Sequence, residues 1–330
     1  MQGISIIICT YNGKNKLNET LSAIKLLKAT CAWELIIVDN ASTDGTATYV
    51  TSLLEQSDID WRILNETTPG LIHARLCGLR ASKYDFLLYC DDDNTLANDY
   101  LEIGFDILKN NNKVGALGGC GFPVFEGKKP DWFDTYSHSF AVGPQAHKDG
   151  KISNYPAEIY GAGAFFRKPV LEHFINKGFK SGLSGRTANN LVSGEDVEWC
   201  YLIQLAGYEI WYDHRLKFKH TMPEGRMNWE YYLKLKRGIA SGTGKLLPYS
   251  CLFMYPNAGF FRFLLLMLKK IITSNIIYLK LIFSRIIFFR TLTPQEELTQ
   301  MIWKSKAISY WKDFFKSFRH FSYLKKSLKN

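Results

Sequence analysis

The stretch YDFLLYCDDDN, from Tyr84 to Asn94, decides the fold of this chain, because a run of apolar and aromatic residues ends in three consecutive aspartates. The run from Phe86 to Cys90 is typical of a strand buried on both faces, as central strands of parallel sheets are. Such a strand delivers Asp91, Asp92 and Asp93 to one end of a sheet. Because side chains alternate along an extended chain, we expect Asp91 and Asp93 to face one cleft and Asp92 to point away into the surrounding structure.

Two carboxylates that converge on one cleft predict a divalent metal ion. They repel each other unless a cation lies between them, and oxygen ligands favour Mg²⁺ or Mn²⁺. The alternative is a polar loop whose aspartates cap a helix. Capping needs one aspartate, however, and this loop has three in a row.

Before this stretch, short apolar runs alternate with amphipathic ones. The patterns predict strands at residues 4–9, 33–40 and 59–65, and helices at residues 16–28, 42–55 and 69–82. This alternation indicates right-handed crossovers and a mostly parallel α/β sheet flanked by helices. Ligands bind such sheets at the carboxyl ends of the strands, where Tyr11, Asp39 and the three aspartates fall.

Length and composition narrow the class of protein. A chain of 330 residues with 46% hydrophobic residues has one large domain or about two. Its seven cysteines are scattered without CxxC spacing, which indicates neither a zinc site nor a disulfide framework and fits a reducing compartment. The beginning, MQGISIIICTYNG, lacks the basic and long apolar regions of a signal peptide, so we expect a cytoplasmic protein.

Motifs in both halves of the chain resemble those of one enzyme family. CTYNG, IIVDNASTDGT, GLIHARLCGL and the aspartate-tipped strand follow one another as in nucleotide-sugar glycosyltransferases of family 2, which have the A-type fold. YGAGAFFRKPVL, SGEDVEWCYLIQLAGYEIWYD and KHTMPEGR are similar to later motifs of bacterial surface-polysaccharide transferases. The resemblance covers residues 1–245 and not the tail. It implies a nucleotide-sugar donor, first of all a UDP-sugar, and a glycan or lipid-linked acceptor.

The resemblance also implies roles for residues at the strand ends. The loop Thr10 to Asn12 and Asp39 would hold the nucleobase and the ribose. Asp93 would ligate the Mn²⁺ or Mg²⁺ ion that bridges the diphosphate. Asp91 would be a second ligand or would contact the ribose or a metal-bound water, and Asp92 belongs to the same donor site. A leaving nucleoside diphosphate gathers negative charge, which a metal ion and fixed donors stabilise.

Three further residues complete the donor site. Arg75, in HARLCGL, matches the arginine of the family's ARN motif and would support Asp39 or the diphosphate, although Leu76 replaces the usual asparagine. His220 follows RLKFK and is a candidate metal ligand at its family position; the alternative is a structural histidine. Arg186 lies in the polar, glycine-rich FKSGLSGRTANNL, a candidate lid over the donor, and would contact a phosphate.

The motif SGED, residues 193–196, opens a predicted amphipathic helix. In the functional interpretation Asp196 is the general base that removes a proton from the acceptor hydroxyl as it attacks the anomeric carbon, and Glu195 orients the base or the acceptor. One base without a second catalytic carboxylate implies direct displacement with inversion, whereas a glycosidase needs two carboxyl groups. The alternative is that Ser-x-x-Asp only caps the helix.

The net charge of +10 is concentrated in the tail. Between Gly259 and Asn330 there are 14 lysines and arginines against 3 acidic residues, a surplus of 11 that leaves residues 1–258 at −1. Phe, Leu and Ile at helical spacing between these cations favour an anionic membrane surface and not nucleic acid. The longest uncharged apolar run, Phe263 to Leu268, is far shorter than the ~20 residues of a spanning helix. We therefore expect peripheral attachment to the inner face of the cell membrane; the alternative is helices packed on the catalytic domain.

These observations predict a catalytic domain over residues 1–245, with a nucleotide-binding half up to residue 120 and an acceptor half after it, followed by a basic helical region over residues 246–330. The predicted activity is inverting, metal-dependent glycosyl transfer in surface-polysaccharide synthesis. Two alternatives stay open. A nucleotidyltransferase would need a glycine-rich phosphate loop, and TYNGKNK is a poor one. A non-catalytic, membrane-associated assembly subunit would not need Asp91, Asp93 and Asp196 to be intact.

Overall fold

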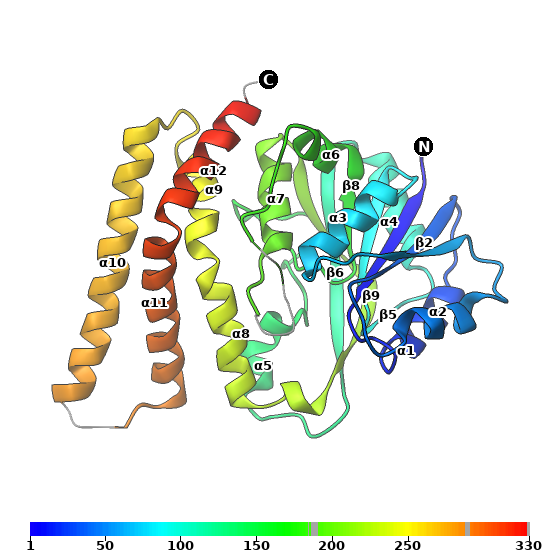
Figure 1. The fold of residues 1–330 in the computed structure, drawn as a ribbon, viewed down its shortest axis with the longest axis horizontal. Coiled ribbons are helices and arrows are strands. Elements are labelled where there is room, and N and C mark those ends of the chain that lie inside the picture. Colours follow the sequence, from blue (N-terminus) through cyan, green and yellow to red (C-terminus); the bar gives the residue numbers. More distant parts are fainter. Residues whose placement is uncertain (184, 186–190, 288–290, 329–330) are drawn as a thin grey trace. The chain divides into compact units, whose positions relative to one another are not determined.

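The computed structural model describes residues 1–183, 185, 191–287 and 291–328 (Figure 1). Its contacts divide the chain into two compact units. The first consists of Met1–Asn176 with Trp199–Met227, and the second of Lys177–Glu198 with Asn228–Asn330. The two units do not meet at residue 245, where the sequence predicts that the catalytic domain ends. That functional boundary stays a prediction.

The first unit is an α/β structure built on a single sheet. Its strands are β1 (Ile4–Thr10), β2 (Trp33–Asp39), β3 (Trp61–Asn65), β4 (Phe86–Asp91), β5 (Asn94–Leu96), β6 (Val114–Phe125), β7 (Gly150–Lys151), β8 (Ala164–Arg167) and β9 (Glu209–Met222). Its helices are α1 (Leu17–Lys25), α2 (Thr46–Leu54), α3 (Leu71–Ala81), α4 (Tyr100–Asn110), α5 (Phe133–Tyr136), α6 (Lys168–Asn176) and the short 3₁₀ helices η1 (Ser137–Phe140) and η2 (Glu224–Arg226). The strands and helices predicted before residue 92 are all present, with ends shifted by a few residues.

The sheet is mixed. Within the described residues its order is β3-β2-β1-β4-β8-β6-β9-β5, and β7 pairs with β9. The first four strands are parallel, as the sequence predicts. In the second half, β8 runs antiparallel to β4 and β6, and β5 runs antiparallel to β9. Because β2 and β4 flank β1 on opposite sides, the strand order reverses at β1, and a ligand crevice is expected at the carboxyl ends there.

The apolar run of β1 reflects burial on both faces. Ile6 and Ile8 belong to the core cluster that includes Leu21 of α1 and Val50 of α2. Ile7, which points to the other face, lies against α3, where a Cβ on Gly78 would come within 2.5 Å of the Ile7 side chain. A strand with helices on both faces has no polar side, and this explains why β1 lacks alternation.

A fully buried carboxylate, that of Glu34 in β2, joins three segments of the first unit. One of its oxygens accepts hydrogen bonds from the Ser5 hydroxyl and the Lys83 amide, each at 2.6 Å. The other lies 2.7 Å from the Arg62 guanidinium. A charged group can stay in such a core only because it is paired and hydrogen-bonded.

The substitution Glu34→Ala should therefore lower the free energy of unfolding by about 3 kcal/mol, because buried donors lose their acceptor. Chemical denaturation monitored by circular dichroism measures this change. The matched control is Asp60→Ala, which removes an exposed partner of the same Lys83, 2.8 Å away, and should cost less than about 1 kcal/mol. Equal losses in the two variants would contradict the structural role of Glu34.

Most of the described residues of the second unit are in helices. Its helices are α8 (Trp229–Ser241), α9 (Thr243–Met254), α10 (Phe260–Ile287), α11 (Pro294–Lys312) and α12 (Phe314–Ser327), and it includes the first turn of α7 (Glu195–Leu205). In this unit α10 and α8 pack along α11, and α12 packs along α9 (Figure 1).

The close approach of these helices depends on small residues. The Ser309 hydroxyl accepts a hydrogen bond from the Gly244 amide at 3.0 Å, and the Ser317 hydroxyl donates to the Gly244 carbonyl at 2.7 Å. Phe263 of α10 stacks on Phe321 of α12 with ring centroids 4.4 Å apart. The tail helices are thus part of one compact unit with α8 and α9, although Ile308, Trp311 and Phe315 remain exposed.

Candidate active site

The carboxyl ends of β1, β2 and β4 meet at the point where the strand order reverses. In the parallel register Thr10 pairs with Asp39 and Cys9 pairs with Asp91. The sequence expectation that these strand ends share one edge is confirmed. Thr10 and Asp39 are buried, and Tyr11, the next residue after β1, is 44% exposed.

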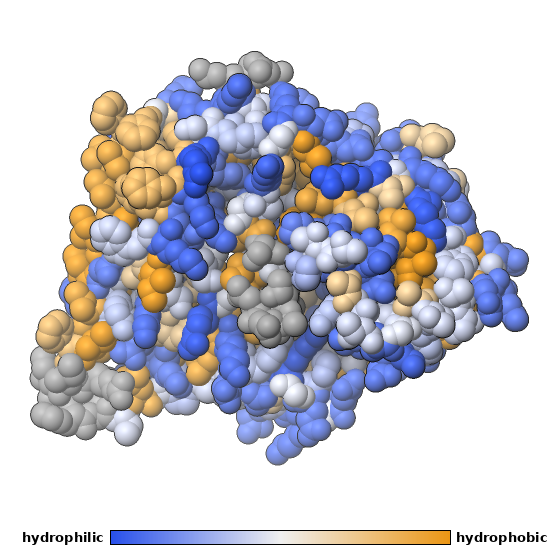
Figure 2. All heavy atoms as spheres, viewed as in Figure 1, coloured by the Kyte–Doolittle hydropathy of each residue, from blue (hydrophilic) through white to orange (hydrophobic). Residues whose placement is uncertain are grey.

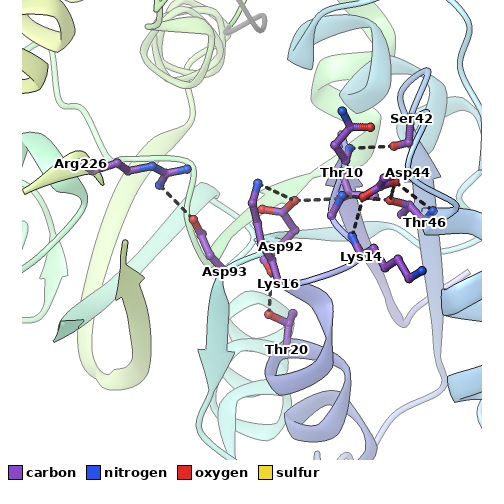
Figure 3. A network of polar contacts seen from close by, with 12 residues as sticks. Thr10, Lys14, Lys16, Thr20, Ser42, Asp44, Thr46, Asp92, Asp93 and Arg226 are labelled. Carbon is purple, nitrogen blue, oxygen red and sulfur yellow. Dashed lines mark hydrogen bonds and ion pairs between the residues drawn. The ribbon is translucent and has the colours of Figure 1, made fainter. Parts of the chain in front are cut away.

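The loops after β1 and β2 are bound to each other (Figure 3). Asn12 adopts a left-handed backbone conformation, with φ of 48°, which asparagine tolerates better than most residues. Its amide donates to the Ser42 hydroxyl and its side-chain oxygen accepts from the Thr43 amide, both at 2.9 Å. Asp39 accepts from the Ser42 amide at 3.0 Å, and Asp44 accepts from the Lys14 amide at 3.2 Å. Asn12 and Asp39, both predicted to bind donor, therefore also fix the shape of this loop pair.

Asn40, directly after β2, holds the next loop. Its amide donates to the carbonyls of Glu66 and Thr68, and its oxygen accepts from the Gly70 amide at 2.8 Å. The following Ala41 has φ of 61°, a conformation that costs roughly 1–2 kcal/mol for a residue with a Cβ. The three bonds of Asn40 offset that strain.

The three aspartates point in different directions. Strand β4 ends at Asp91, and Asp92 and Asp93 lie in a turn before β5, so the alternation expected from an extended chain does not continue through them. Asp92 turns toward β1, where it accepts a 2.7 Å hydrogen bond from the Thr10 hydroxyl and lies 3.7 Å from the Lys16 ammonium (Figure 3). Asp93 points the other way.

Asp93 lies between an imidazole and a guanidinium. One oxygen is 3.3 Å from Nε2 of His220 in β9. The other is 3.1 Å from Nη1 of Arg226 in η2 (Figure 3). Burial by itself raises the pKa of Asp93, but the His220 ring and the Arg226 guanidinium outweigh this and hold it well below its usual range. Burial, together with the charge of Asp93, raises the pKa of Asp92. Asp93 therefore stays ionised at a lower pH than Asp92 does.

Asp91 faces Arg75 of α3. The guanidinium of Arg75 lies 3.9 Å from the Asp91 carboxylate and over the Tyr89 ring, 5.4 Å from its centroid. A Cβ on Gly161 would come within 2.6 Å of this guanidinium, so the glycine leaves room for Arg75. The sequence predicts Asp39 or a phosphate as the partner of Arg75, and the structure shows a pair with Asp91.

The group at Asp93 fits a divalent ion by its chemistry. It supplies carboxylate oxygens and an imidazole, the ligand types that suit Mn²⁺ and related ions. Nδ1 of His220 is buried and has no hydrogen-bond partner among the described residues, and Asp91 is partly exposed at the strand end. The ligand atoms of Asp91, Asp93 and His220 do not all lie within 4.8 Å of one another, and Arg226 and Arg75 pair with the two carboxylates.

Asp149, Asp213 and His214 form a separate group that could hold a metal ion. Their ligand atoms lie within 4.8 Å of one another. Arg215 already binds both oxygens of Asp213, at 2.9 and 2.8 Å, and Asp149 is bonded to the His214 amide and ring. Asp213 is seven positions before His220 in β9, about 20 Å along an extended strand, so a metal here would be distinct from one at Asp93.

The SGED motif does begin a helix, because α7 starts at Glu195. Asp196 is half-buried and accepts from the Val197 amide at 2.9 Å, while Glu195 is buried and accepts from the Gly194 amide at 3.1 Å. Both belong to the second unit, whereas the three aspartates and His220 belong to the first. Arg186 lies outside the described residues.

Three charged residues with marked environments were not predicted. Arg226 pairs with Asp93, and Lys16 pairs with Asp92. Glu198 is fully buried in the first turn of α7, and burial raises its pKa to about 7. Arg226 ends the quoted motif KHTMPEGR and could have been proposed from it, but a partner 133 residues away in the chain leaves no local signal for pairing.

The family model for glycosyl transferase family 2 matches residues 5–174, and the chain belongs to this family. A glucosyl-dolichyl phosphate glucuronosyltransferase of Haloferax volcanii is 24% identical over 264 residues, which cover 78% of this chain and 79% of that protein.

Solved structures share the fold. A mannosyltransferase from Pyrobaculum calidifontis, in complex with GDP-Man and Mn²⁺, has a TM-score of 0.55 and 17% identity, covering 94% of this chain and 87% of that chain. S. aureus TarS in complex with UDP-GlcNAc has a TM-score of 0.52 and 16% identity, covering 77% and 72%. The A-type glycosyltransferase fold predicted from the sequence, with additional C-terminal helices, is confirmed.

Proposed function

We propose that this glycosyltransferase is metal-dependent and inverting, and that it moves a sugar from a nucleotide-diphosphate donor to a hydroxyl of a glycan or lipid-linked acceptor. The observation that carries the proposal is the buried Asp93 carboxylate at the end of β4, with His220 and Arg226 on either side. A carboxylate kept ionised between an imidazole and a guanidinium is suited to bind a metal ion. That ion would stabilise the negative charge of the diphosphate as it leaves.

Asp93, Asp91 and His220 would hold the ion, and Mn²⁺ or Mg²⁺ bound there would stabilise the negative charge of the leaving diphosphate. Arg226 and Arg75 pair with Asp93 and Asp91. When the metal ion binds these carboxylates, either guanidinium could contact phosphate oxygens instead. Arginine binds carboxylate and phosphate groups with the same N–H donors. The loop Thr10 to Asn12 and Asp39 would bind the nucleoside.

Asp196 would act as general base. It takes the proton of the acceptor hydroxyl while the acceptor oxygen bonds to the anomeric carbon. The bond from that carbon to the phosphate oxygen breaks, and its electron pair leaves with the nucleoside diphosphate. A single displacement of this kind inverts the configuration of the anomeric carbon, and Glu195 would orient the base or the acceptor.

Donor and acceptor are proposed from the sequence motifs and the relatives together. The solved neighbours bind UDP-GlcNAc or GDP-Man, and the Haloferax relative is named for glucosyl-dolichyl phosphate, a lipid-linked sugar. These names support a nucleotide-sugar donor, with UDP-sugars tested first, and a lipid-linked acceptor in surface-polysaccharide synthesis.

Asp93→Asn should abolish stimulation of UDP-sugar hydrolysis by Mn²⁺ or Mg²⁺, because the variant loses the charge that holds the ion. The protein should stay folded, since relief of repulsion from Asp92 offsets weaker pairing with Arg226. Hydrolysis and thermal stabilisation are measured with and without each metal. Asp149→Asn is the matched control. If this variant loses metal dependence while Asp93→Asn keeps it, the ion binds at Asp149, Asp213 and His214 and not at Asp93.

Asp196→Asn should leave the affinity for donor nearly unchanged and reduce turnover by about 10² or more, the usual size of a lost general base. Donor affinity is measured by calorimetry and turnover by release of nucleoside diphosphate. Glu230→Gln, an exposed carboxylate change on α8, serves as control. Loss of donor binding with turnover of bound donor intact would show that Asp196 is a binding residue.

We also propose that α10 attaches the enzyme to an anionic membrane surface. The side chains exposed on one face follow each other at intervals of three and four residues: Phe261, Leu265, Leu268, Ile272, Ile276, Leu279 and Phe283. Figure 2 shows hydrophobic atoms along this helix. The opposite face, with Phe263, Met267 and Ile271, is buried in the unit. A continuous exposed apolar stripe of this length is unusual for a surface that faces only water.

The charges on α10 support this partner. The helix contains no acidic residue, and Arg262, Lys269 and Lys280 are exposed beside the stripe. Each cation near an anionic bilayer is worth about 1 kcal/mol. In the described part of the chain no helix is long and apolar enough to cross a membrane. These features support a helix that lies in the interface, on the inner face of the cell membrane, near a lipid-linked acceptor.

The triple substitution Leu265→Gln, Ile272→Gln and Ile276→Gln should abolish sedimentation with anionic vesicles while hydrolysis of donor is retained, because these side chains are exposed. Truncation near residue 250 is unsuitable, since it would uncover Tyr249 and Gly244 of α9. Wild-type binding should weaken as salt rises. Leu26→Gln, at an exposed leucine of the first unit, is the control. Unchanged vesicle binding by the triple variant would exclude this membrane face.

A further inference from the structure

A buried carboxyl group in the second unit has no part in the proposed chemistry. Glu198 lies in the first turn of α7 and its side chain is completely buried. Its amide donates to the Gly194 carbonyl at 2.8 Å, so Glu198 closes the turn that begins the helix. Burial raises the pKa of this carboxyl to about 7, although three hydrogen bonds act in the opposite direction.

These hydrogen bonds come from two separate parts of the unit. The Ser181 hydroxyl donates to one carboxylate oxygen. The other oxygen accepts from the Gly182 amide at 3.2 Å and from the Tyr249 hydroxyl of α9 at 3.0 Å. The Ser181 hydroxyl also accepts a hydrogen bond from the Leu183 amide at 3.0 Å, and its single proton is shared between the Glu198 carboxylate and the Leu183 carbonyl, which is 2.9 Å away. Glu198 therefore ties the segment before residue 184 to α9.

The contact continues into α12. Nε2 of His320 lies 2.8 Å from the Tyr249 hydroxyl and 3.6 Å from the Glu198 carboxylate. The Tyr249 and His320 rings also contact each other, with centroids 5.2 Å apart. Burial lowers the pKa of His320 to about 4, so the ring is neutral at neutral pH. The last helix of the chain is in this way connected to the first turn of α7.

Packing alone does not require a carboxyl group at this position. An apolar side chain of similar volume would fill the space without the desolvation cost of an acid. The carboxyl group instead accepts directional hydrogen bonds from Ser181, Gly182 and Tyr249. These bonds fix the 181–182 turn and α9 relative to the first turn of α7. Residues two apart in a helix point to opposite sides, so a Glu198 held in the interior turns Asp196 away from the interior of this unit.

We propose that Glu198 is a positioning residue: through Ser181, Gly182 and Tyr249 it fixes the first turn of α7 and thereby the orientation of Asp196. The proposal rests on the proposed role of Asp196 as general base. It also gives the C-terminal helices a part in catalysis, because α9 and α12 supply one side of the junction that holds this turn.

The test compares Glu198→Ala with Glu198→Gln in the full chain. Glutamine keeps an oxygen for Gly182 and Tyr249, and its amide can donate to the Ser181 hydroxyl, which itself donates to Leu183. The assay measures hydrolysis of a UDP-sugar that the wild-type enzyme turns over. We expect Glu198→Ala to lower kcat by about 10-fold or more and to keep KM for this donor within about 3-fold of wild type. Glu198→Gln should restore kcat to within about 3-fold of wild type.

Two further variants separate positioning from stability. Met301→Ala removes a buried side chain of α11 in the same unit and should keep kcat when assayed below its unfolding temperature. Tyr249→Phe removes one hydroxyl from the junction, keeps the ring, and should lower kcat in the same direction as Glu198→Ala. It supplies the test if the alanine variant does not fold. Hydrogen exchange of the peptide over residues 193–201 should be faster in Glu198→Ala and Tyr249→Phe, and unchanged in Met301→Ala.

The inference is overturned if Glu198→Ala, or Tyr249→Phe in its place, keeps kcat within 2-fold of wild type, or if Glu198→Gln is as impaired as the alanine variant. Asp196→Asn keeps the two hypotheses apart. If Asp196→Asn is inactive while Glu198→Ala is active, the positioning role of Glu198 is wrong and the role of Asp196 as base stands. If Asp196→Asn retains wild-type turnover, the proposed base is wrong, and faster exchange in Glu198→Ala would then report only a structural junction.

Discussion

The carboxylate of Asp93, held between His220 and Arg226, is the interaction on which the organisation of the candidate site depends. It joins the turn after β4 to β9 and η2, which follow it by more than a hundred residues in the chain. A buried carboxylate can stay ionised only beside compensating charge, so the strand β9 and the residues after it must reach this turn. The pairing of Asn94 with His220 in the β5–β9 ladder keeps them in register.

The neighbouring aspartates show how one short stretch can serve three purposes. Asp92 ties β4 to Thr10 and Lys16 at the start of the chain, and Asp91 faces Arg75. Each carboxylate therefore has a basic or hydroxyl partner from a different element. This division relieves the repulsion that three adjacent negative charges would otherwise produce. It also means that ligands entering the site meet cations already placed beside the carboxylates.

The tail illustrates the difference between composition and placement. Its basic, aromatic composition indicated a membrane surface for all of residues 246–330. In the structure Phe321 and Tyr310 are buried, Phe318 packs on Phe263, and the exposed apolar stripe lies on α10. Helical periodicity shows that a helix has two faces, but it cannot show which face another helix covers. The proposed membrane contact is accordingly narrower than the charge count suggested.

The sequence by itself determined the family, the fold class and the order of the first strands and helices, because buried parallel strands and amphipathic helices leave periodic patterns in neighbouring residues. It also placed Tyr11, Asp39 and Asp91 at one sheet edge, since the carboxyl ends of parallel strands lie on the same edge. Only the tertiary structure decided that Asp92 and Asp93 diverge in a turn, that Arg75 pairs with Asp91, and that Arg226 and Glu198 are held by partners distant in the chain. Such pairings depend on the tertiary packing of side chains. A linear sequence carries no local signal for them, whether the partners are 16 positions apart, as Arg75 and Asp91 are, or 133, as Asp93 and Arg226 are.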